Sequence, residues 1–247
     1  MVEDFILFAL VGFAAQAVDG ALGMAYGVTA TSVLLGLGVP PATASASVHA
    51  AEVFTTGASG AAHWRQGNTR REIVWRLAVA GALGGVAGAL ALVSLPATLV
   101  RVAVSAYLLV VGLLLLGMAL GRVPRRAGVP RHLVPLGLAG GFLDAIGGGG
   151  WGAAVTPTLI SQGAVPRVAV GSANLAEFFV ALAVSATFLL AIGLELWPMI
   201  LGLIAGGVVA APFAAKLARR VPDRALMALV GGVVVLLSIR GLVQALG

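Results

Sequence analysis

An internal repeat constrains the fold of this chain more than any other feature. Shifted by 125 residues, the chain matches itself without a gap. Asp19 then aligns with Asp144, and Glu52 aligns with Glu177. From Asp19 to Phe54, 12 of 36 positions are identical in the second copy, against roughly a tenth expected by chance for so biased a composition. Other repeated pairs are Gly23/Gly148, Gly27/Gly152, Thr31/Thr156, Gly38/Gly163, Pro41/Pro166 and Ser47/Ser172.

Composition places this repeat in a membrane. Sixty per cent of the 247 residues are apolar, 10% are charged, and the mean hydropathy is +1.07, whereas an average soluble domain is about 25% charged. The length suits one membrane domain over residues 1–247, with about six to eight spans of ~20 residues each. A carboxyl group in hydrocarbon is costly, so one that recurs in both halves indicates function.

The net charge of +6 does not indicate a nucleic-acid partner. The basic residues lie in short loops between apolar segments rather than on one face, which is typical of cytoplasmic loops of membrane proteins. Cysteine is absent, and the three histidines, His49, His63 and His132, lack the spacing of metal ligands. Motifs of hydrolases, zinc proteases and ATP-binding proteins are also missing. We therefore expect neither an enzyme nor a cofactor or metal site.

Six apolar segments are long enough to cross a bilayer as helices: 42–64, 73–94, 98–121, 168–193, 197–217 and 224–246. Segments 3–37 and 133–163 differ, since each holds two short apolar runs of about 11 to 16 residues around an acidic, glycine-rich patch. Each is predicted to form a broken or re-entrant helical hairpin, whose turn must be enclosed by protein or face a watery cavity. Repeat one (1–121) and repeat two (133–247) thus each comprise a hairpin and three transmembrane helices, joined by a cytoplasmic linker at 122–132.

The charge distribution favours opposite orientations for the two repeats. If each hairpin returns to the side from which it started, each repeat makes an odd number of crossings and the second is inverted relative to the first. Then 13 of the 15 basic residues face one side, which the positive-inside rule makes cytoplasmic. These residues lie in 65–76, 122–131, at Arg167 and in 216–224. Both termini are expected on the opposite side of the cytoplasmic (inner) membrane.

Glu52 and Glu177 are the first candidate site residues. Each lies about ten residues into a predicted span, near the bilayer midplane. The neutral acid is favoured there over the carboxylate, so we expect these groups to hold a proton at neutral pH and to couple proton movement to transport. The alternative is a structural role, in which a neutral glutamate hydrogen-bonds across a helix interface. Recurrence in both repeats favours coupling.

The glycine-rich hairpin tips form the second candidate. Their glycines are Gly23 and Gly27 in the first hairpin and Gly148, Gly149 and Gly150 in the second. Glycine lets the backbone turn and approach a ligand closely. A short helix that follows such a turn presents free N–H groups and its positive dipole end, which suit a small anion. The tips follow Asp19 and Asp144, which are candidates for cation binding, proton relay or helix capping.

Polar side chains near each glutamate complete the predicted substrate site. They are Ser47 and His49 before Glu52, Ser172 and Asn174 before Glu177, and Tyr26, Trp151 and Thr156 as pocket walls. Residues three apart on a helix share a face, so His49 and Asn174 are expected beside their glutamates. A protonated His49 would offer an anion a partner that Asn174 does not; a packed structural histidine is an equal alternative.

The repeated block resembles the TauE/SafE sulfite exporter family of membrane permeases. The resemblance rests on DAIGGGG at 144–150, Pro157 and GSANLAE at 171–177, and it covers essentially the whole chain. It implies secondary transport of a small sulfur-containing or organic anion, such as sulfite or sulfoacetate. The first repeat departs from the pattern, with Ser32 in place of Pro157 and His49 in place of Asn174. It also has GALGMAYG at 20–27 where the second has a run of four glycines. The two halves of the site are therefore expected to be unequal.

Together these features predict an all-α polytopic membrane protein with two inverted repeats, which carries a small anion with protons by alternating access. A passive anion channel is one alternative. A cation carrier is another, and it would need several oxygen ligands to converge from the embedded acids. The expected partners are the anion, protons and the lipid bilayer, and assembly into a homo-oligomer is left open.

Overall fold

The described part of the chain is helical throughout its regular structure. The computed structural model describes residues 2–22, 25–121, 132–193, 197–220 and 222–246. In chain order its helices are α1 (Val2–Leu22), α2 (Tyr26–Gly36), α3 (Pro41–Arg65), α4 (Arg71–Ser94), α5 (Ala97–Ala119), α6 (Leu133–Gly147), α7 (Trp151–Ser161), α8 (Pro166–Ile192), α9 (Trp197–Arg220) and α10 (Asp223–Leu246). The predicted all-α class is confirmed.

Helix boundaries in the two halves coincide at the 125-residue shift. α1 ends at Leu22 and α6 at the aligned Gly147, while α2 and α7 begin and end at aligned residues. α3 and α8 both begin at aligned prolines, since the first helical position needs no hydrogen-bonded N–H and tolerates the fixed φ of proline. The two copies of the repeated sequence therefore break their helices at the same places.

Four helices of the described residues are long and apolar enough to cross a membrane: Arg71–Ser94, Thr98–Ala119, Arg167–Ile192 and Met227–Ala245. Two of the six predicted spans fall outside this group. α3 is long enough at 25 residues, but polar side chains such as His49 and Glu52 lower its hydropathy. In the described part of α9, the apolar stretch is shorter and covers Trp197–Ala210. The chain is a multi-pass membrane protein.

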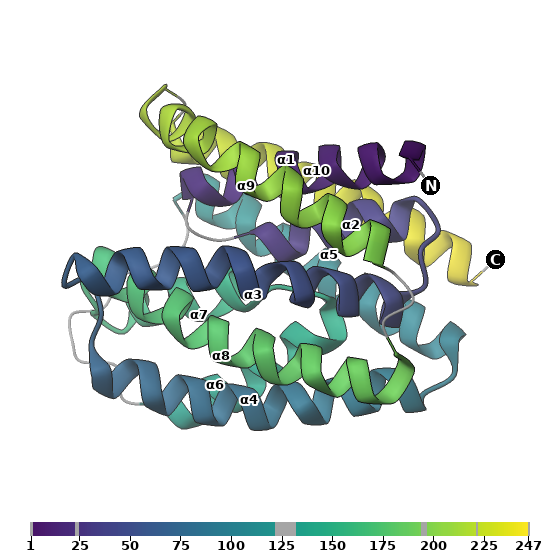
Figure 1. Cartoon of the computed structure of the whole chain (residues 1–247), viewed down its shortest axis with the longest axis horizontal. Coiled ribbons are helices and arrows are strands. Elements are labelled where there is room, and N and C mark those ends of the chain that lie inside the picture. Colours follow the sequence, from purple (N-terminus) through teal and green to yellow (C-terminus); the bar gives the residue numbers. More distant parts are fainter. Residues whose placement is uncertain (1, 23–24, 122–131, 194–196, 221, 247) are drawn as a thin grey trace.

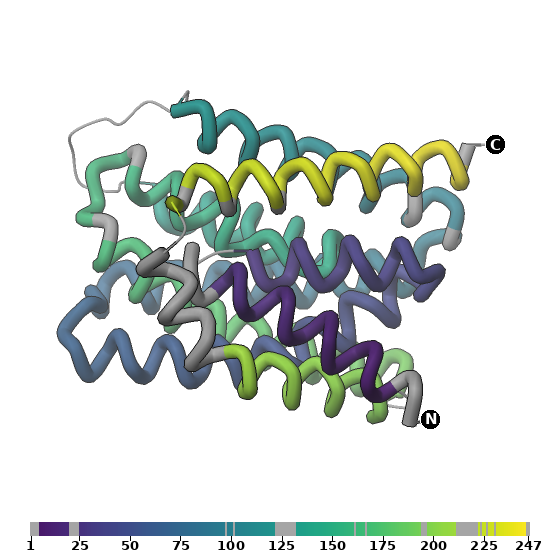
Figure 2. Tube along the Cα trace, turned by 90° about the horizontal axis from the view of Figure 1, so that it is seen from above, coloured from purple at the N-terminus to yellow at the C-terminus, as the bar shows by residue number. Residues whose placement is uncertain are grey.

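Two hairpins interrupt the series of long helices. α2 and α7 have 11 residues each, or about 16 Å of helix, too short for a hydrocarbon core of ~30 Å. α1 is longer than predicted, at 21 residues, because the helix continues through Asp19 and Gly20 instead of breaking at them. The α1–α2 hairpin opens towards the end of the molecule where α10 terminates, whereas α6–α7 opens towards the opposite end (Figures 1 and 2).

The helices pack in a continuous row, in the order α1, α9, α3, α8, α4 and α6, and α5 and α10 form a separate antiparallel pair (Figure 2). The α1–α9 and α4–α6 pairs, which the repeat makes equivalent, approach through glycine. A side-chain carbon at Gly206 would collide with the backbone of Ala9, and one at Gly141 with the backbone of Gly81. Small residues permit such close approach between membrane helices. α3 and α8, which carry the two repeated glutamates, lie in contact at the centre of the row.

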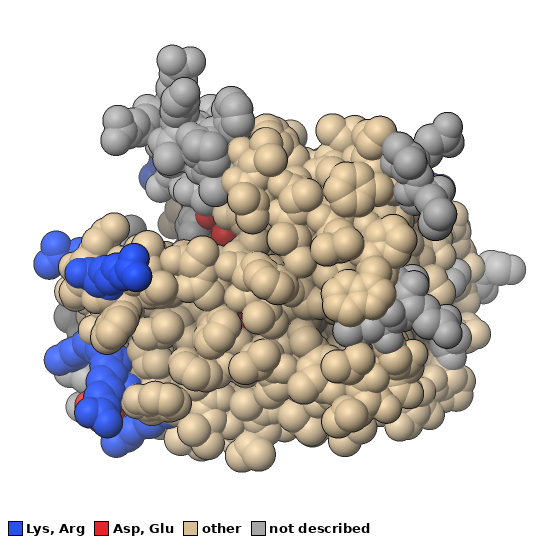
Figure 3. All heavy atoms as spheres, viewed as in Figure 1, with Lys and Arg blue, Asp and Glu red and all other residues tan. Residues whose placement is uncertain are grey.

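Basic side chains gather at one end of the molecule. In Figure 3 most of the visible blue atoms lie where α3 ends and α4 begins. The exposed arginines at this end include Arg65, Arg70, Arg71, Arg76 and Arg167. The long faces between the two ends are largely free of charge in this view, as a lipid-facing surface requires.

Candidate functional site

The tips of the two hairpins meet backbone to backbone. A side-chain carbon built on Gly27 would lie 2.5 Å from the Cα of Gly149 and 2.5 Å from Oε1 of Glu52, so there is no room for a side chain at this position. The hydroxyl of Thr31 donates a hydrogen bond to the carbonyl of Gly148. Gly148 and Gly149 have φ values of +67° and +124°, which glycine adopts without strain. Gly27 and Thr31 thus contact Gly148 and Gly149, more than 100 residues away in sequence, and we call this contact between the hairpin tips the joint.

Each aspartate caps the short helix of its own hairpin. Oδ1 of Asp144 accepts a hydrogen bond of 2.8 Å from the backbone N–H of Trp151, and Oδ1 of Asp19 accepts one of 3.2 Å from that of Tyr26. Both N–H groups belong to the first residue of a helix, where no intrahelical acceptor exists. Helix capping, one of the roles considered for these aspartates, is therefore present in both repeats.

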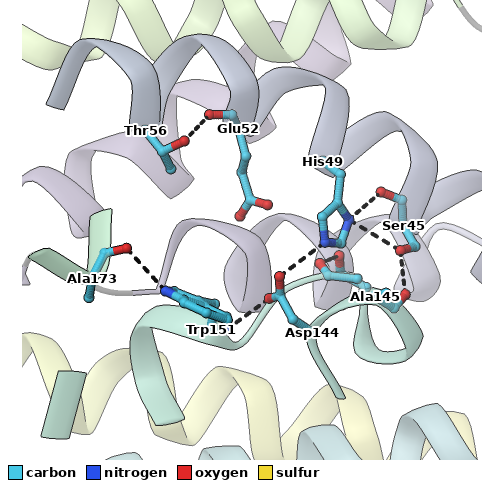
Figure 4. Close-up of polar contacts among 10 residues, drawn as sticks. Ser45, His49, Glu52, Thr56, Asp144, Ala145, Trp151 and Ala173 are labelled. Atoms are coloured by element: carbon cyan, nitrogen blue, oxygen red, sulfur yellow. Dashed lines mark hydrogen bonds and ion pairs between the residues drawn. The ribbon is translucent and has the colours of Figure 1, made fainter. Parts of the chain in front are cut away.

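The second aspartate has a further partner. Nε2 of His49 lies 3.2 Å from Oδ2 of Asp144, and Nδ1 of His49 lies 2.8 Å from the carbonyl oxygen of Ser45 (Figure 4). The Ser45 hydroxyl donates to the carbonyl of Ala145 at 2.6 Å. Both ring nitrogens of His49 are thus engaged within the protein. In the other half, Asn174 donates instead to the hydroxyl of Ser59 at 2.8 Å, and the predicted inequality is visible in these contacts.

A small polar pocket lies beside the joint. It is lined by Asp19, Ala25, Tyr26, Gly27, Glu52, Thr55, Thr56, Ser59, Gly150, Gly152, Asn174 and Glu177. Its free volume is about 10 Å³, roughly what the centre of one water molecule needs. The walls come from both hairpin tips and from α3 and α8, so both repeats contribute.

Carboxyl groups dominate the electrostatics of this pocket. Glu52 and Glu177 are 1% and 7% exposed, and Asp19 lines the same space. Figure 4 shows the Glu52 carboxyl pointing from α3 towards the segment that carries Asp144 and Trp151. Its Oε2 has no hydrogen-bond partner among the described residues. Asp19, Asp144 and Glu177 all lie close enough to act electrostatically on Glu52.

Of the predicted site residues, the structure brings Asp19, Gly27, Glu52, Gly150, Asn174 and Glu177 into this pocket. His49 and Asp144 pair beside it, Trp151 is fully buried with its indole N–H on the carbonyl of Ala173, and Gly148 and Gly149 form the joint. The hydroxyls of Ser47 and Thr156 are buried without a partner in the described structure, and neither lines the pocket. Gly23 lies outside the described residues.

Ser172 lies elsewhere than predicted. Its hydroxyl accepts a hydrogen bond of 2.9 Å from the backbone N–H of Arg70, at the residue before α4. That position is near the basic end of the molecule, because α4 begins there. Ser172 thus binds the backbone of the segment that connects α3 to α4. The sequence alone did not indicate this, since Ser172 is spaced from Glu177 as Ser47 is from Glu52.

Sequence reasoning did not select three hydroxyl residues of the pocket. Thr55, Thr56 and Ser59 follow Glu52 at spacings of three, four and seven residues, the periodicity that places side chains on one helix face. Thr56 donates to the backbone carbonyl of Glu52 at 2.6 Å. A search for polar residues in helical register with Glu52, continued past it along α3, would have found them.

Among the described residues, no group of three or more histidine, cysteine, aspartate or glutamate side chains is placed to hold a metal ion. The carboxyl groups of the pocket face one space, but they do not form the tight oxygen cage that a divalent cation requires.

Comparisons with known proteins agree with this architecture. Residues 8–241 match the family model described as sulfite exporter TauE/SafE. The chain is 41% identical over 251 residues to a protein of Bacillus subtilis (strain 168) named "Probable membrane transporter protein YtnM", a match that covers 98% of this chain and 84% of that protein. No solved structure matches the chain. Both matches cover nearly the whole chain and are to membrane transport proteins, so the protein is a membrane transporter rather than an enzyme, and the chain belongs to the sulfite exporter TauE/SafE family.

Proposed function

We propose that this protein is a secondary transporter that carries small sulfur-containing or organic anions, such as sulfite or sulfoacetate, across the cytoplasmic membrane together with protons. One observation carries the proposal: Asp19, Glu52 and Glu177, from three different helices, line a single small pocket beside the hairpin tips. Family membership supports transport as the activity and a sulfur oxyanion as the first substrate to test. The name of the B. subtilis relative supports a membrane transport role.

The carboxyl groups make anion binding depend on protons. Ionised carboxylates a few ångströms from an anion in a poorly solvated site repel it by several kcal/mol. Protonated carboxyl groups instead donate O–H hydrogen bonds. An anion therefore binds this pocket well only when Glu52 or Glu177 carries a proton, and the two bound species then move together. Asn174 and the hydroxyl groups of Thr55 and Ser59 supply neutral donors for the anion.

The two repeats are proposed to be inverted. Their hairpins open towards opposite ends of the molecule (Figure 1). Their packing partners exchange as inversion requires, since α1 lies along α9 and its equivalent α6 lies along α4. Inverted repeats allow two states of equal architecture, in which one hairpin or the other separates from the joint and opens the pocket to its own side. The nearly closed pocket corresponds to an occluded step of this alternating access.

The basic end is proposed to face the cytoplasm. The exposed arginines near the α3–α4 connection cluster there, and α1 begins and α10 ends at the opposite end (Figures 1 and 3). Positively charged loops are retained on the cytoplasmic side of the inner membrane.

Labelled sulfite flux into proteoliposomes, driven by an imposed pH gradient, tests the proposal. Protein-free liposomes under the same gradient account for sulfite that crosses as a neutral species. Accumulation above this blank that disappears when the gradient is collapsed supports a proton-coupled carrier. Flux that ignores the gradient and shows no counterflow exchange would instead identify a passive anion pore.

A cation carrier is the second candidate, because the same pocket gathers three carboxyl groups with hydroxyl and amide oxygens. Sodium is the cation that such a loose oxygen set suits, since divalent ions need closer ligands. Uptake of labelled sodium into the same proteoliposomes, measured at constant pH and without sulfite, separates the two candidates. A cation carrier is expected to take up sodium under these conditions, whereas the anion–proton proposal predicts no uptake above the protein-free blank.

A further inference from the structure

A second cavity lies between α2, α5 and α10. It is lined by Ser32, Leu35, Gly36, Gly38, Val39, Ser105, Leu108, Leu237, Ser238, Arg240, Gly241 and Gln244. Its free volume is about 40 Å³, compared with about 10 Å³ for the pocket at the joint, so it has room for a few water-sized groups. Its lining includes the last residues of α2 and residues near the end of α10, and both helices end on the side where the first hairpin opens (Figure 2).

A buried hydroxyl faces this cavity without a partner. Ser32 is 2% exposed, and its Oγ makes no hydrogen bond within the described structure. Most buried polar groups in proteins are hydrogen-bonded, so an unpaired hydroxyl that lines a cavity indicates a missing partner such as a ligand or water. Ser238, by contrast, satisfies its hydroxyl on the carbonyl of Val234 at 2.7 Å.

An arginine supplies positive charge to the same cavity. Arg240 belongs to the apolar stretch Met227–Ala245 and lies six residues before the last residue of α10, or about 9 Å along the axis. No carboxyl group lines the cavity, and no ion pair of Arg240 occurs among the described residues. The Arg240 side chain is partly exposed but also lines the cavity, and an arginine in a membrane helix that faces a polar cavity is a candidate to bind an anion.

The polar lining exists in one repeat only. At the 125-residue shift, Ser32 aligns with Pro157, Ser105 with Val230, Ser238 with Leu113, Arg240 with Leu115 and Gln244 with Ala119. Every polar residue of the lining has an apolar or proline counterpart. The equivalent helices therefore need no polar groups at these positions for their architecture. A merely snorkelling arginine would account for Arg240, but not for the hydroxyl and amide residues around it.

We propose that this cavity is a second anion-binding site, which takes a small oxyanion such as sulfite, a sulfonate or the phosphate of a lipid headgroup. The Arg240 guanidinium pairs with the oxyanion and the Ser32 hydroxyl donates to it. Ser32 directly follows Thr31, whose hydroxyl holds the Gly148 carbonyl at the joint. An anion bound here is therefore one residue away from the contact that must break when the first hairpin moves. The proposal that an anion binds here depends only on the residues that line the cavity. A role for this site in admitting substrate from outside the cell rests on the proposed function.

Sulfite binding to the whole protein in phosphatidylcholine nanodiscs, measured calorimetrically without a pH gradient, tests the site. Arg240→Gln is expected to weaken binding about tenfold or more, as the loss of one charge-assisted hydrogen bond implies. Arg224→Gln is the matched control, since it removes the same charge from the other end of α10. Thr29→Val is the control for Ser32→Ala, because Thr29 also has an unpaired buried hydroxyl on α2 but does not line the cavity.

A second experiment, in phosphatidylglycerol nanodiscs, distinguishes a soluble oxyanion from the phosphate of a lipid headgroup. A lipid headgroup is identified if phosphatidylglycerol stabilises the wild-type protein more than phosphatidylcholine does, if Arg240→Gln loses this difference, and if the protein does not bind sulfite. Arg240-dependent sulfite binding in phosphatidylcholine identifies a soluble anion. If neither response depends on Arg240 or Ser32, the proposal is overturned. If Arg240→Gln fails to fold, Ser32→Leu replaces it in the test, because it fills the cavity, leaves Arg240 in place and should also block anion binding. Binding that depends on Arg240 in a protein without gradient-driven flux would leave this site standing while the proposed transport fails.

Discussion

Nε2 of His49 lies 3.2 Å from Oδ2 of Asp144, and both side chains are buried from solvent. The other oxygen of Asp144 caps α7 through the N–H of Trp151. One carboxyl group thus links α3 of the first repeat to both parts of the second hairpin. The aligned Asp19 makes the same cap, but the residue in the place of the histidine, Asn174, turns to Ser59 instead. The two halves share a backbone plan and differ in this link.

The difference between the two aspartates is testable by matched substitution. An Asn oxygen still accepts the capping hydrogen bond, so Asp144→Asn and Asp19→Asn keep both caps. Only Asp144→Asn also replaces the carboxyl oxygen that contacts a buried histidine, and we expect it to lower the free energy of unfolding by about 1–3 kcal/mol more than Asp19→Asn. Thermal unfolding in detergent measures this. Equal losses would mean that the His49 contact contributes nothing to stability.

Removing the titratable group from either central glutamate is expected to uncouple flux from protons. Glu52→Gln and Glu177→Gln keep the shape of the side chain but cannot exchange a proton. Labelled sulfite accumulation under a pH gradient should fall to the level of protein-free liposomes in both variants. Glu72→Gln, at an exposed carboxyl on α4, is the control and should transport normally. Gradient-driven accumulation that persists in both pocket variants would remove these residues from the coupling mechanism.

The backbone at the start of the two short helices predicts opposite effects of exchanging alanine and glycine. Ala25 has φ +116° and the aligned Gly150 has φ +133°, a region that favours glycine. Ala25→Gly should stabilise the protein by about 1 kcal/mol through relief of strain. Gly150→Ala should cost about 2 kcal/mol or more, because a Cβ there would also collide with the hydroxyl of Tyr107. Comparison of unfolding midpoints decides, and a destabilised Ala25→Gly would show that this strain is absent.

Close helix packing predicts that two helical glycines respond differently to the same change. Gly141→Ala places a methyl group against the backbone of Gly81 and should separate α4 from α6, at a cost of about 2–3 kcal/mol. Gly117→Ala meets nothing within 4 Å and should be neutral or gain up to about 1 kcal/mol from helix propensity. Folded yield and thermal stability in detergent report both. If Gly141→Ala behaves like Gly117→Ala, the backbone contact between these helices is not required.

The sequence by itself determined the membrane class, the internal repeat and the presence of one helix break in each hairpin, although α1 continues past Asp19 before it ends. Hydropathy is a local property, and the aligned breaks before Tyr26 and Trp151 follow from residues that are close in sequence. The pairing of Glu52 with Glu177 as equivalent acids was likewise visible from the repeat. These features can be recognised from residues close together in the sequence or from comparison of the two repeats. They are enough to assign the central residues of the pocket to the correct helices.

The tertiary structure decided which of those residues meet. Ser172 and Ser47 are equivalent in sequence, yet Ser172 contacts the backbone of Arg70 and Ser47 has no partner in the described structure. His49 pairs with Asp144, 95 residues away. Such contacts depend on how the helices rotate and slide against each other when they pack. Rotation and register are set by side-chain shapes on both partners at once, so no periodicity within one helix reveals them.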